Sequence, residues 1–368
     1  PGATGQAPPP PPATGLEEIL PGRPPLPHAE EKGAFFVYQR ELAPGTRLEQ
    51  YEVLSVLGSG GFGITYLGFD LTLEIKVAIK EYMPSAMATR NTDRYTVVLT
   101  SHQEKDYQSG MERFLEEARI LAKLQNTPNI VSVQNYFREN NTAYFVMEYV
   151  NGTSLKAYLA AHGEKISCEE ALKILLPVMN ALVSVHSMQL LHRDISPDNI
   201  MVDNEGKIKL IDFGSVRGQS AETDKTYTVI LKHGYAPPEQ YYAKGKQGPW
   251  TDIYSLCATM YKMLTGEVPP NGVERMEEDT YVDPSKKGIS VSERTETVLR
   301  KGLAVKAPER YQDIGQLLTD LYGSGPVTAG NAMPQANPYT ASGNGNSSMS
   351  ASTVSYTHLR AHETVLDL

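Results

Sequence analysis

The first half of the chain alternates apolar and polar positions in short runs. Between residues 51 and 100, the segments YEVLSVLG, ITYLGFD and KVAIKEY are rich in β-branched and aromatic residues, and turn residues separate them. Runs of this length and composition are typical of β-strands joined by short turns. The pattern therefore predicts successive antiparallel strands in this region.

Further along the chain, apolar residues recur every three or four positions instead of every second position. This spacing between residues 111 and 124 predicts a helix, and IVSVQNYF and TAYFVMEYV predict two further strands after it. Beyond residue 153 helical patterns dominate. We therefore expect an α+β fold, with a small antiparallel β-rich lobe at about 51–150 carrying one helix and a larger, mainly helical lobe at about 151–322. The apolar positions of the predicted helix are Phe114, Leu115, Ala118, Leu121 and Ala122.

Both ends of the chain have a composition that cannot bury a core. Residues 1–44 contain APPPPPATG and PGRPPLP, which favour extended polyproline conformations, and residues 323–353 are rich in Gly, Ser and Asn. We interpret both segments as linkers, which leaves 45–322 as the folded domain. Because the chain begins with Pro1, we expect it to be a fragment.

The last residues are expected not to belong to the natural protein. The stretch VSYTHLRAHET, residues 354–364, resembles one reading frame of a transposase adapter used to prepare sequencing libraries. Residues 354–368 are therefore interpreted as an artefact of sequence assembly. The alternative is a genuine polar tail, and neither interpretation gives the segment a function.

Composition narrows the class of protein. With 368 residues and 40% apolar content the chain can bury a substantial core, and its net charge of −9 argues against a general nucleic-acid binder. Cys168 and Cys257 lack CxxC spacing, so neither a disulfide framework nor a zinc site is expected, and a reducing, cytoplasmic setting fits best. The longest apolar stretch, 171–185, contains a Lys, a Pro and an Asn and is too short to span a membrane.

The segment GSGGFG, residues 58–63, lies between two predicted strands. A glycine-rich hairpin gives the same letters, so the motif alone is weak evidence for phosphate binding. A dinucleotide-binding fold would place a helix directly after the glycines, and a strand follows here, which disfavours that fold. The remaining functional interpretation is a loop whose backbone amides close over phosphates.

Two charged residues occupy positions expected to face inward. Lys80 follows Val77 and Ile79 in a predicted strand, where a lone lysine would more often lie at an edge or surface. Glu117 shares the inward stripe of the predicted helix, whereas Glu116 points more toward solvent. A carboxylate on a buried face needs a partner, and Lys80 is the candidate.

The helical half contains LHRDISPDNIMVD and, further on, IKLIDFG. Asp194 is a candidate general base, and Asn199 and Asp212 offer oxygen ligands suited to Mg²⁺. Each residue alone would more often be a solvated or capping residue. Their order and spacing together favour a catalytic interpretation.

The ordered set GSGGFG, VAIK, helix Glu, HRD…N, DFG and PPE resembles the bacterial eukaryotic-type (Hanks-type) serine/threonine protein kinases over about residues 51–320, a specific match. The resemblance implies a bilobal kinase that transfers phosphate from ATP, with Mg²⁺, to Ser or Thr of proteins. It implies that Lys80 holds the ATP phosphates and pairs with Glu117, that Asp194 is the base, and that Asn199 and Asp212 bind metal. Met147 would be the gatekeeper of an adenine-binding hinge, MEYV. The implied nucleotide-binding residues are Leu57, Gly58, Ser59, Gly60, Gly61, Phe62, Gly63, Thr65, Ala78, Lys80, Met147, Glu148, Val150 and Met201.

The resemblance also implies two supporting roles. Asp252, in TDIYSLCATMYKMLTG, would hold the catalytic loop in place, and Arg310 would be the buried partner of Glu239. Both roles are structural.

The chain departs from the family pattern at several positions. Thr65 replaces a Val that covers the adenine, and Ser196 stands where serine/threonine kinases carry a Lys beside the transferred phosphoryl group. Leu231 and Lys232 replace the usual GT before the Tyr235 to Glu239 motif, so Lys232 aligns with the missing Thr. We hypothesise that Lys232 and Ser196 have exchanged roles. The alternative is that Lys232 faces solvent.

Two other functions share parts of this pattern. A pseudokinase would have lost one of its four catalytic or metal-binding residues, and all are present. A small-molecule phosphotransferase would lack the long segment from Asp212 to Glu239, whose hydroxyls suggest a phosphorylation switch. The expected partners are ATP and protein substrates, not nucleic acid, and membrane attachment of a longer natural protein is left open. The hydroxyl residues are Ser220, Thr223, Thr226, Tyr227 and Thr228.

Overall fold

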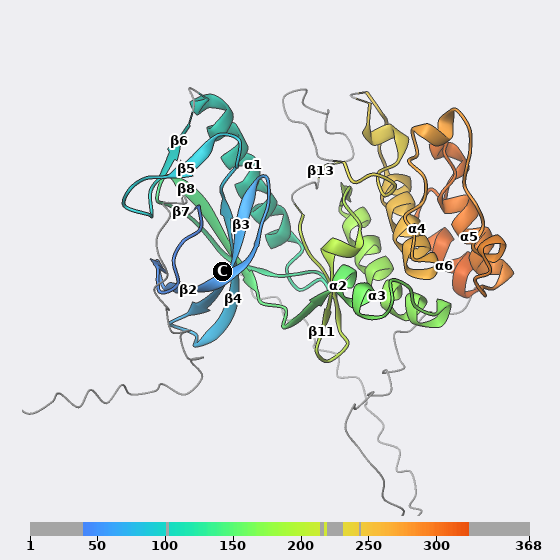
Figure 1. The fold of residues 1–368 in the computed structure, drawn as a ribbon, viewed down its shortest axis with the longest axis horizontal. Coiled ribbons are helices and arrows are strands. Elements are labelled where there is room, and N and C mark those ends of the chain that lie inside the picture. Colours follow the sequence, from blue (N-terminus) through green and yellow to red (C-terminus); the bar gives the residue numbers. More distant parts are fainter. Residues whose placement is uncertain (1–39, 101–102, 214–216, 219–230, 243, 324–368) are drawn as a thin grey trace, which may run out of the picture. The chain divides into compact units, whose positions relative to one another are not determined.

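The computed structural model describes residues 40–100, 103–213, 217–218, 231–242 and 244–323 (Figure 1). The expected linkers, except for residues 40–44 and Gly323, and the adapter-like segment lie outside this part of the chain. The hydroxyl-rich stretch from Ser220 to Thr228 also lies outside it.

A six-stranded antiparallel sheet forms the first half of the fold, in the order β1-β2-β3-β4-β8-β7. Buried and partly exposed positions alternate along β3, as expected of a strand with one face against a core. The strands predicted from the sequence are confirmed, and a small hairpin, β5 with β6, follows β4. The strands are β1 (Arg47–Leu48), β2 (Tyr51–Ser59), β3 (Gly63–Asp70), β4 (Ile75–Tyr82), β5 (Ala88–Arg90), β6 (Val97–Leu99), β7 (Val133–Glu139) and β8 (Thr142–Glu148).

Helix α1 (Glu104–Lys123) packs on strands β8 and β7. Its Phe114 ring lies 4.9 Å from the ring of Phe145 in β8, centroid to centroid. The helix begins before the residues whose apolar spacing predicted it. Its first turn is mainly polar, so the apolar pattern did not include that turn. Glu104 and Asp106 occupy that turn, where acidic side chains interact favourably with the helix dipole.

The opposite face of the sheet carries a buried polar network centred on Glu81. Both of its carboxylate oxygens accept bonds from tyrosine hydroxyls, 2.7 Å from Tyr66 and 2.9 Å from Tyr144, and the Arg90 guanidinium pairs with it. The Tyr66 hydroxyl also accepts a bond from the backbone N–H of Leu42, whose side chain is buried. Leu42, just before the expected boundary at residue 45, thus contacts this face of the sheet.

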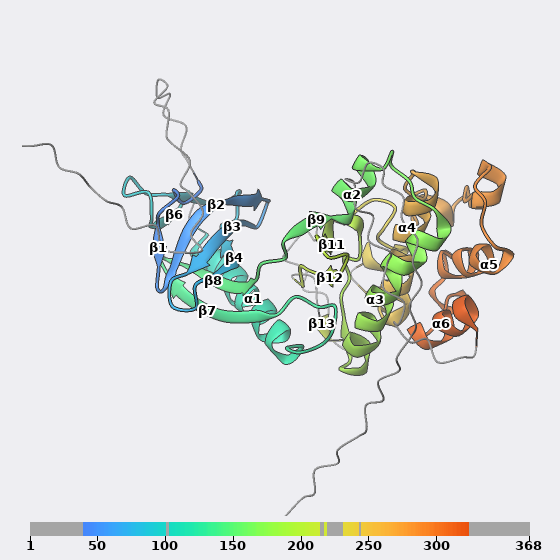
Figure 2. The same cartoon turned by 90° about the horizontal axis from the view of Figure 1, so that it is seen from below.

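The second half of the described chain is mainly helical, as predicted (Figure 2). Helix α4 packs against α3 and α5, and nearly all of its residues are buried. Strand β11 (Ile200–Asp203) pairs with β9 (Gly152–Ser154) and β12 (Ile208–Leu210), and β10 (Leu190–Leu191) pairs with β13 (Arg217–Gly218). The helices are α2 (Leu155–Ala161), α3 (Cys168–Ser187), α4 (Pro249–Thr265), α5 (Glu293–Gly302) and α6 (Ile314–Tyr322).

Among the helices that the structure describes, none combines the length and apolar character needed to cross a lipid bilayer.

Candidate active site

Lys80 lies at the centre of a three-residue charge cluster. Its Nζ atom is 2.9 Å from Glu117 Oε1 on α1 and 2.9 Å from Asp212 Oδ1, which follows β12. The Glu117 side chain is buried, whereas the neighbouring Glu116 is exposed and pairs with Arg119. The structure therefore brings together Lys80 and Glu117, the pair expected from the sequence, and adds Asp212 to it.

This cluster favours the charged form of Lys80. Burial alone would lower the pKa of the ammonium, but the nearby carboxylates of Asp212 and Glu117 outweigh burial and hold the pKa above its ordinary value. Lys80 is therefore a fixed cation on the sheet face that α1 covers, suited to binding a negatively charged group.

Asp194 and Asn199 are joined by two hydrogen bonds. The Asn199 side-chain amide donates to the Asp194 backbone oxygen at 2.8 Å and to Asp194 Oδ2 at 2.9 Å. Since the NH₂ group of the Asn199 side chain faces Asp194, the side-chain oxygen of Asn199 points away from Asp194. Burial raises the pKa of the Asp194 carboxyl, which opposes the lowering by Lys232 and His192. A carboxylate with a raised pKa is better able to accept a proton in a reaction.

Asp252 in α4 holds the loop that carries Asp194. Asp252 Oδ2 accepts from the backbone N–H of His192 at 2.9 Å, and Oδ1 accepts from that of Arg193 at 2.7 Å. Arg193 has a φ of 67°, a left-handed conformation that costs energy outside glycine and needs such support. The structural role expected for Asp252 is thus what the structure shows.

The side chains of Asp212 and Phe213 point in different directions. Phe213 is fully buried and packs edge-on against the His192 ring, with centroids 4.7 Å apart, while the Asp212 side chain is partly exposed and reaches Lys80. Asp212 also has a left-handed φ, of 60°. Burial of the aromatic ring therefore fixes a strained backbone that directs the carboxylate into the charge cluster.

The glycine-rich segment forms the turn between β2 and β3. The backbone N–H of Gly60 donates to Gly63 at 2.9 Å, and a Cβ on Gly63 would lie only 2.4 Å from the carbonyl oxygen of Glu81. Glycine is therefore required at 63 for the strands to approach this closely. Leu57 and Phe62 on this segment are exposed, as are Gly58, Ser59, Gly60 and Gly61.

Several expected nucleotide-binding residues share one face of the sheet. Thr65 lies opposite Lys80, which lies opposite Phe145, and Ala78 lies opposite Met147, so all point to the face that carries Lys80. Val150 and Met201, also expected in this site, are partly buried.

The Glu148 side chain is engaged elsewhere. Its Oε1 atom accepts from Lys209 Nζ at 2.6 Å and from the backbone N–H of Ser132 at 2.9 Å. The carboxylate therefore links the end of β8 to β12, and the backbone N–H group of Glu148 donates to the carbonyl oxygen of Ser132 at 3.0 Å.

The structure also brings Lys232 to Ser196. Lys232 Nζ donates to Ser196 Oγ at 2.8 Å and lies 3.2 Å from Asp194 Oδ1. Lys232 thus contacts the loop that carries Asp194, while its side chain remains 30% exposed.

The sequence did not single out Asp198, which belongs to the same group. Its Oδ2 atom is 3.7 Å from Lys232 Nζ, and its Oδ1 atom is 3.0 Å from Lys156 Nζ. Its place two residues after Ser196 was the available signal, because a second acid in so short a loop suggests a shared cation.

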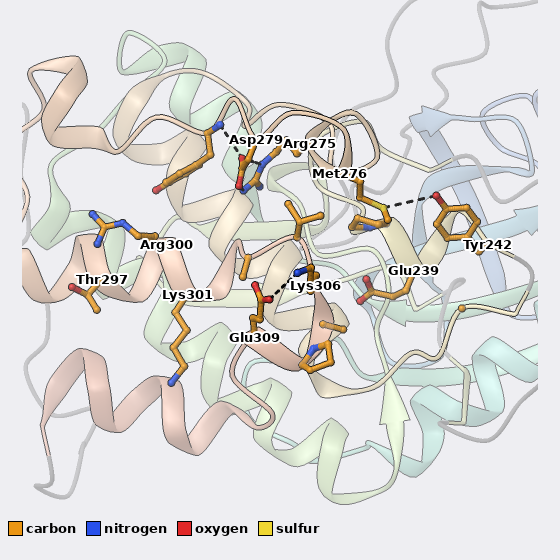
Figure 3. Close-up of a pocket in the computed structure, with 17 residues that line it drawn as sticks. Glu239, Tyr242, Arg275, Met276, Asp279, Thr297, Arg300, Lys301, Lys306 and Glu309 are labelled. Atoms are coloured by element: carbon orange, nitrogen blue, oxygen red, sulfur yellow. Dashed lines mark hydrogen bonds and ion pairs between the residues drawn. The ribbon is translucent and has the colours of Figure 1, made fainter.

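A separate pocket of about 950 Å³ lies beside α5 (Figure 3). It is lined by none of the residues expected to bind ATP or metal or to catalyse, and several of its polar side chains are paired, for example Arg275 with Asp279 and Lys306 with Glu309. Glu239 forms part of the lining and makes a buried ion pair with Arg310, as expected from the sequence. The pocket is therefore distinct from the charge cluster around Lys80.

The β-rich and helical halves of the fold, with the charged groups around Lys80 and Asp194, are those of a protein kinase domain. The profile of the protein kinase domain family matches residues 51–320, and the chain belongs to this family. The predicted protein kinase fold is thereby confirmed, and so is the predicted similarity to serine/threonine protein kinases.

The curated proteins that resemble this chain include bacterial kinases. The chain is 32% identical over 283 residues to serine/threonine-protein kinase PrkC of Bacillus subtilis, an alignment that covers 74% of this chain and 40% of PrkC. It is 31% identical over 283 residues to serine/threonine-protein kinase PknA of a Nostoc species, covering 74% of this chain and 47% of PknA. The chain thus spans less than half the length of these curated relatives. The solved apo form of PpkA-294 is 36% identical, with a TM-score of 0.69, over 77% of this chain and 100% of that one.

Proposed function

We propose that this chain transfers the γ-phosphoryl group of ATP to Ser and Thr hydroxyls of protein substrates. The observation that carries the proposal is the position of Lys80, 2.9 Å from both Glu117 and Asp212. Phosphoryl transfer in kinases depends on a fixed lysine cation and a metal-binding aspartate held together. The names of the relatives support the Ser/Thr class.

The nucleotide would lie on the sheet face that carries Lys80. The side chains of Thr65, Ala78 and Met147 line this face and would contact the adenine. The glycine turn at 58–63 would cover the phosphates with backbone N–H groups, and Lys80 would bind the phosphate oxygens.

The donor set fits Mg²⁺. A partly exposed carboxylate, Asp212, and an amide oxygen, Asn199, are hard oxygen ligands, and Mg²⁺ is commonly bound by one or two such groups together with substrate phosphates. When bound, Mg²⁺ supplies positive charge that neutralises the phosphates. Asp212 and Asn199 are therefore proposed as its ligands.

Asp194 would act on the protein substrate. Its carboxylate would accept the hydroxyl proton as the substrate oxygen forms a bond to the γ-phosphorus and the bond from that phosphorus to the β-phosphate oxygen breaks. ADP leaves with the electron pair of the broken bond. The amide of Asn199 holds the Asp194 carboxylate in place for this step.

We also propose that the kinase phosphorylates itself between Asp212 and Glu239. The proposal rests on the hydroxyls of Ser220, Thr223, Thr226 and Thr228, which lie outside the described residues. Arg193, which precedes Asp194 in the sequence, would bind the added phosphate, because a guanidinium can bond a phosphate through two N–H groups.

A third proposal concerns the longer natural protein. Because the relatives are more than twice as long as the region they share with this chain, we propose that a further segment attaches the kinase domain to a membrane or a sensor module. Cell fractionation of the product of the full-length gene tests this. Recovery of the whole product in the soluble fraction would contradict attachment to a membrane.

Phosphate transfer tests the main proposal. The whole chain, incubated with Mg²⁺ and γ-labelled ATP, should label itself or a generic basic protein. Asp194→Asn and Lys80→Met should abolish labelling, and Lys207→Ala, on an exposed turn, should not. Equal labelling by all variants would contradict the assignment, and labelling of small alcohols but no protein would favour a small-molecule phosphotransferase.

A further inference from the structure

The position that usually carries a catalytic lysine holds a buried serine in this chain. Ser196 is fully buried, two residues after Asp194, and its hydroxyl accepts a bond from Lys232 Nζ at 2.8 Å. We propose that Lys232 is a catalytic residue that supplies the positive charge at the transferred phosphoryl group, while Ser196 is the positioning residue that holds it. This inference rests on the proposed kinase function.

The ammonium group has the donors that this role requires. A lysine ammonium carries three N–H groups. One bonds Ser196, and the second lies 3.2 Å from Asp194 Oδ1. Asp198, at 3.7 Å, is an ion partner beyond ordinary hydrogen-bond length. Among the contacts of the described residues, a third N–H group is therefore left for a phosphoryl oxygen beside the Asp194 carboxylate.

The backbone around Lys232 is anchored by the described structure. The carbonyl oxygen of Lys232 accepts from the backbone N–H groups of Tyr235, at 3.1 Å, and Ala236, at 3.0 Å. Gly234 has a φ of 79°, and a Cβ there would lie 2.6 Å from the carbonyl oxygen of Pro269. Ser255 on α4 donates to the carbonyl oxygen of Tyr235 at 2.9 Å. The turn thus fixes the origin of the lysine side chain.

The remaining exposure of the site fits a group that meets a ligand. The side chains of Lys232 and Asp194 are 30% and 28% exposed, so both ends of the ion pair are open to solvent while Ser196 is closed. A purely structural clamp would be expected to bury its charges. A preorganised cation next to the base stabilises negative charge that develops in the transition state.

Two other lysines, Lys80 and Lys156, already have carboxylate partners. Lys80 is held between Glu117 and Asp212, and Lys156 pairs with Asp198 with its side chain 70% exposed. Lys156 is therefore a suitable control, because it shares Asp198 with Lys232 but contacts neither Asp194 nor Ser196 among the contacts that the structure describes.

The test compares kcat and the KM for ATP in five variants of the whole chain. Lys232→Ala and Lys232→Met should lower kcat about ten- to a thousandfold with a smaller change in KM. Ser196→Ala should cost less, and Lys156→Ala should leave kcat near that of the unchanged chain. The double variant Ser196→Lys with Lys232→Thr should recover more activity than Lys232→Ala.

The double variant separates catalysis from a structural role. Ser196→Lys with Lys232→Thr exchanges the two side chains and would again place one cation and one hydroxyl beside Asp194. If the charge is what catalysis needs, kcat should recover although Lys232 itself is absent.

The outcomes are distinguishable. Near-normal kcat in Lys232→Met with an active unchanged chain would overturn this inference alone. A kcat loss that the double variant does not recover would show that a cation beside Asp194 is not what the site needs from Lys232, and would also overturn it. An unchanged chain that transfers no phosphate would overturn the proposed function, and this inference with it. Should Lys232→Ala fail to fold, Lys232→Met, which keeps an unbranched side chain of similar length, carries the test.

Discussion

Arg310 and Glu239 form a two-point ion pair across 71 residues of sequence. Arg310 Nη1 lies 2.7 Å from Glu239 Oε1, and Nη2 lies 3.1 Å from Oε2. The Arg310 side chain is fully buried, and it also donates to the carbonyl oxygens of Ala304 and Val305. The pair therefore ties the PPE segment to the chain before α6.

Replacing Arg310 should strongly destabilise the fold. Arg310→Met leaves Glu239 as an unpaired, nearly buried carboxylate, and breaking a buried pair in this way costs about 3–5 kcal/mol. We expect the midpoint of urea unfolding to fall accordingly. Lys173→Met, which breaks a pair whose partner Glu169 is largely exposed, should leave the midpoint unchanged. Equal midpoints for both variants would contradict the importance of the buried pair.

Adjacent acids on α1 should differ in their effect on activity. Glu117→Gln removes the partner of Lys80 and should lower kcat/KM about tenfold or more, because the lysine loses one of its two anchors. Glu116→Gln, one residue away and exposed, removes only a contact to Arg119 and should be near neutral. Steady-state kinetics of the two variants side by side checks this, and a similar loss in both would point to a general effect on the helix.

Asp252 should act on catalysis through the loop that it holds. In Asp252→Asn an amide N–H group must face a backbone N–H group of either His192 or Arg193, so one of the two bonds is lost. We expect kcat to fall about tenfold or more while the KM for ATP changes little, because Lys80 and the glycine turn do not contact Asp252. A rise in KM with kcat unchanged would show that the loop does not position Asp194.

Autophosphorylation should be confined to one part of the chain. Peptide mass spectrometry after incubation with ATP should find phosphate on Ser220, Thr223, Thr226 or Thr228, and Lys80→Met should carry none. Replacing these four residues with Ala should remove the label from the chain but leave the fold intact. Phosphate found only in residues 1–39 or 324–368 would contradict a switch in the activation segment.

Much of this architecture could be predicted from the sequence because its signals are local. The strands from Tyr51 to Tyr82 follow from their composition, and the core-facing side of α1 follows from its period, so the helical period by itself separates Glu117 from Glu116. The pairing of Lys80 with Glu117 agreed with the expectation that a buried charge needs an opposite one, and the pairing of Arg310 with Glu239 agreed with what the family resemblance implied.

Other contacts were decided only by tertiary structure. Lys80 and Glu81 are neighbours in one strand, and the side chains point to opposite faces of the sheet. Glu81 therefore lies in a network with Arg90 and two tyrosines, to which no local pattern points. The distance between Lys232 and Ser196 likewise depends on how the turn at Gly234 packs against the residues after α4. The sequence determined the types of the charged residues and their strand or helix, but only packing between distant segments determined which charges meet, because the low polarity of a buried site makes each charge depend on the particular neighbours that the fold brings to it.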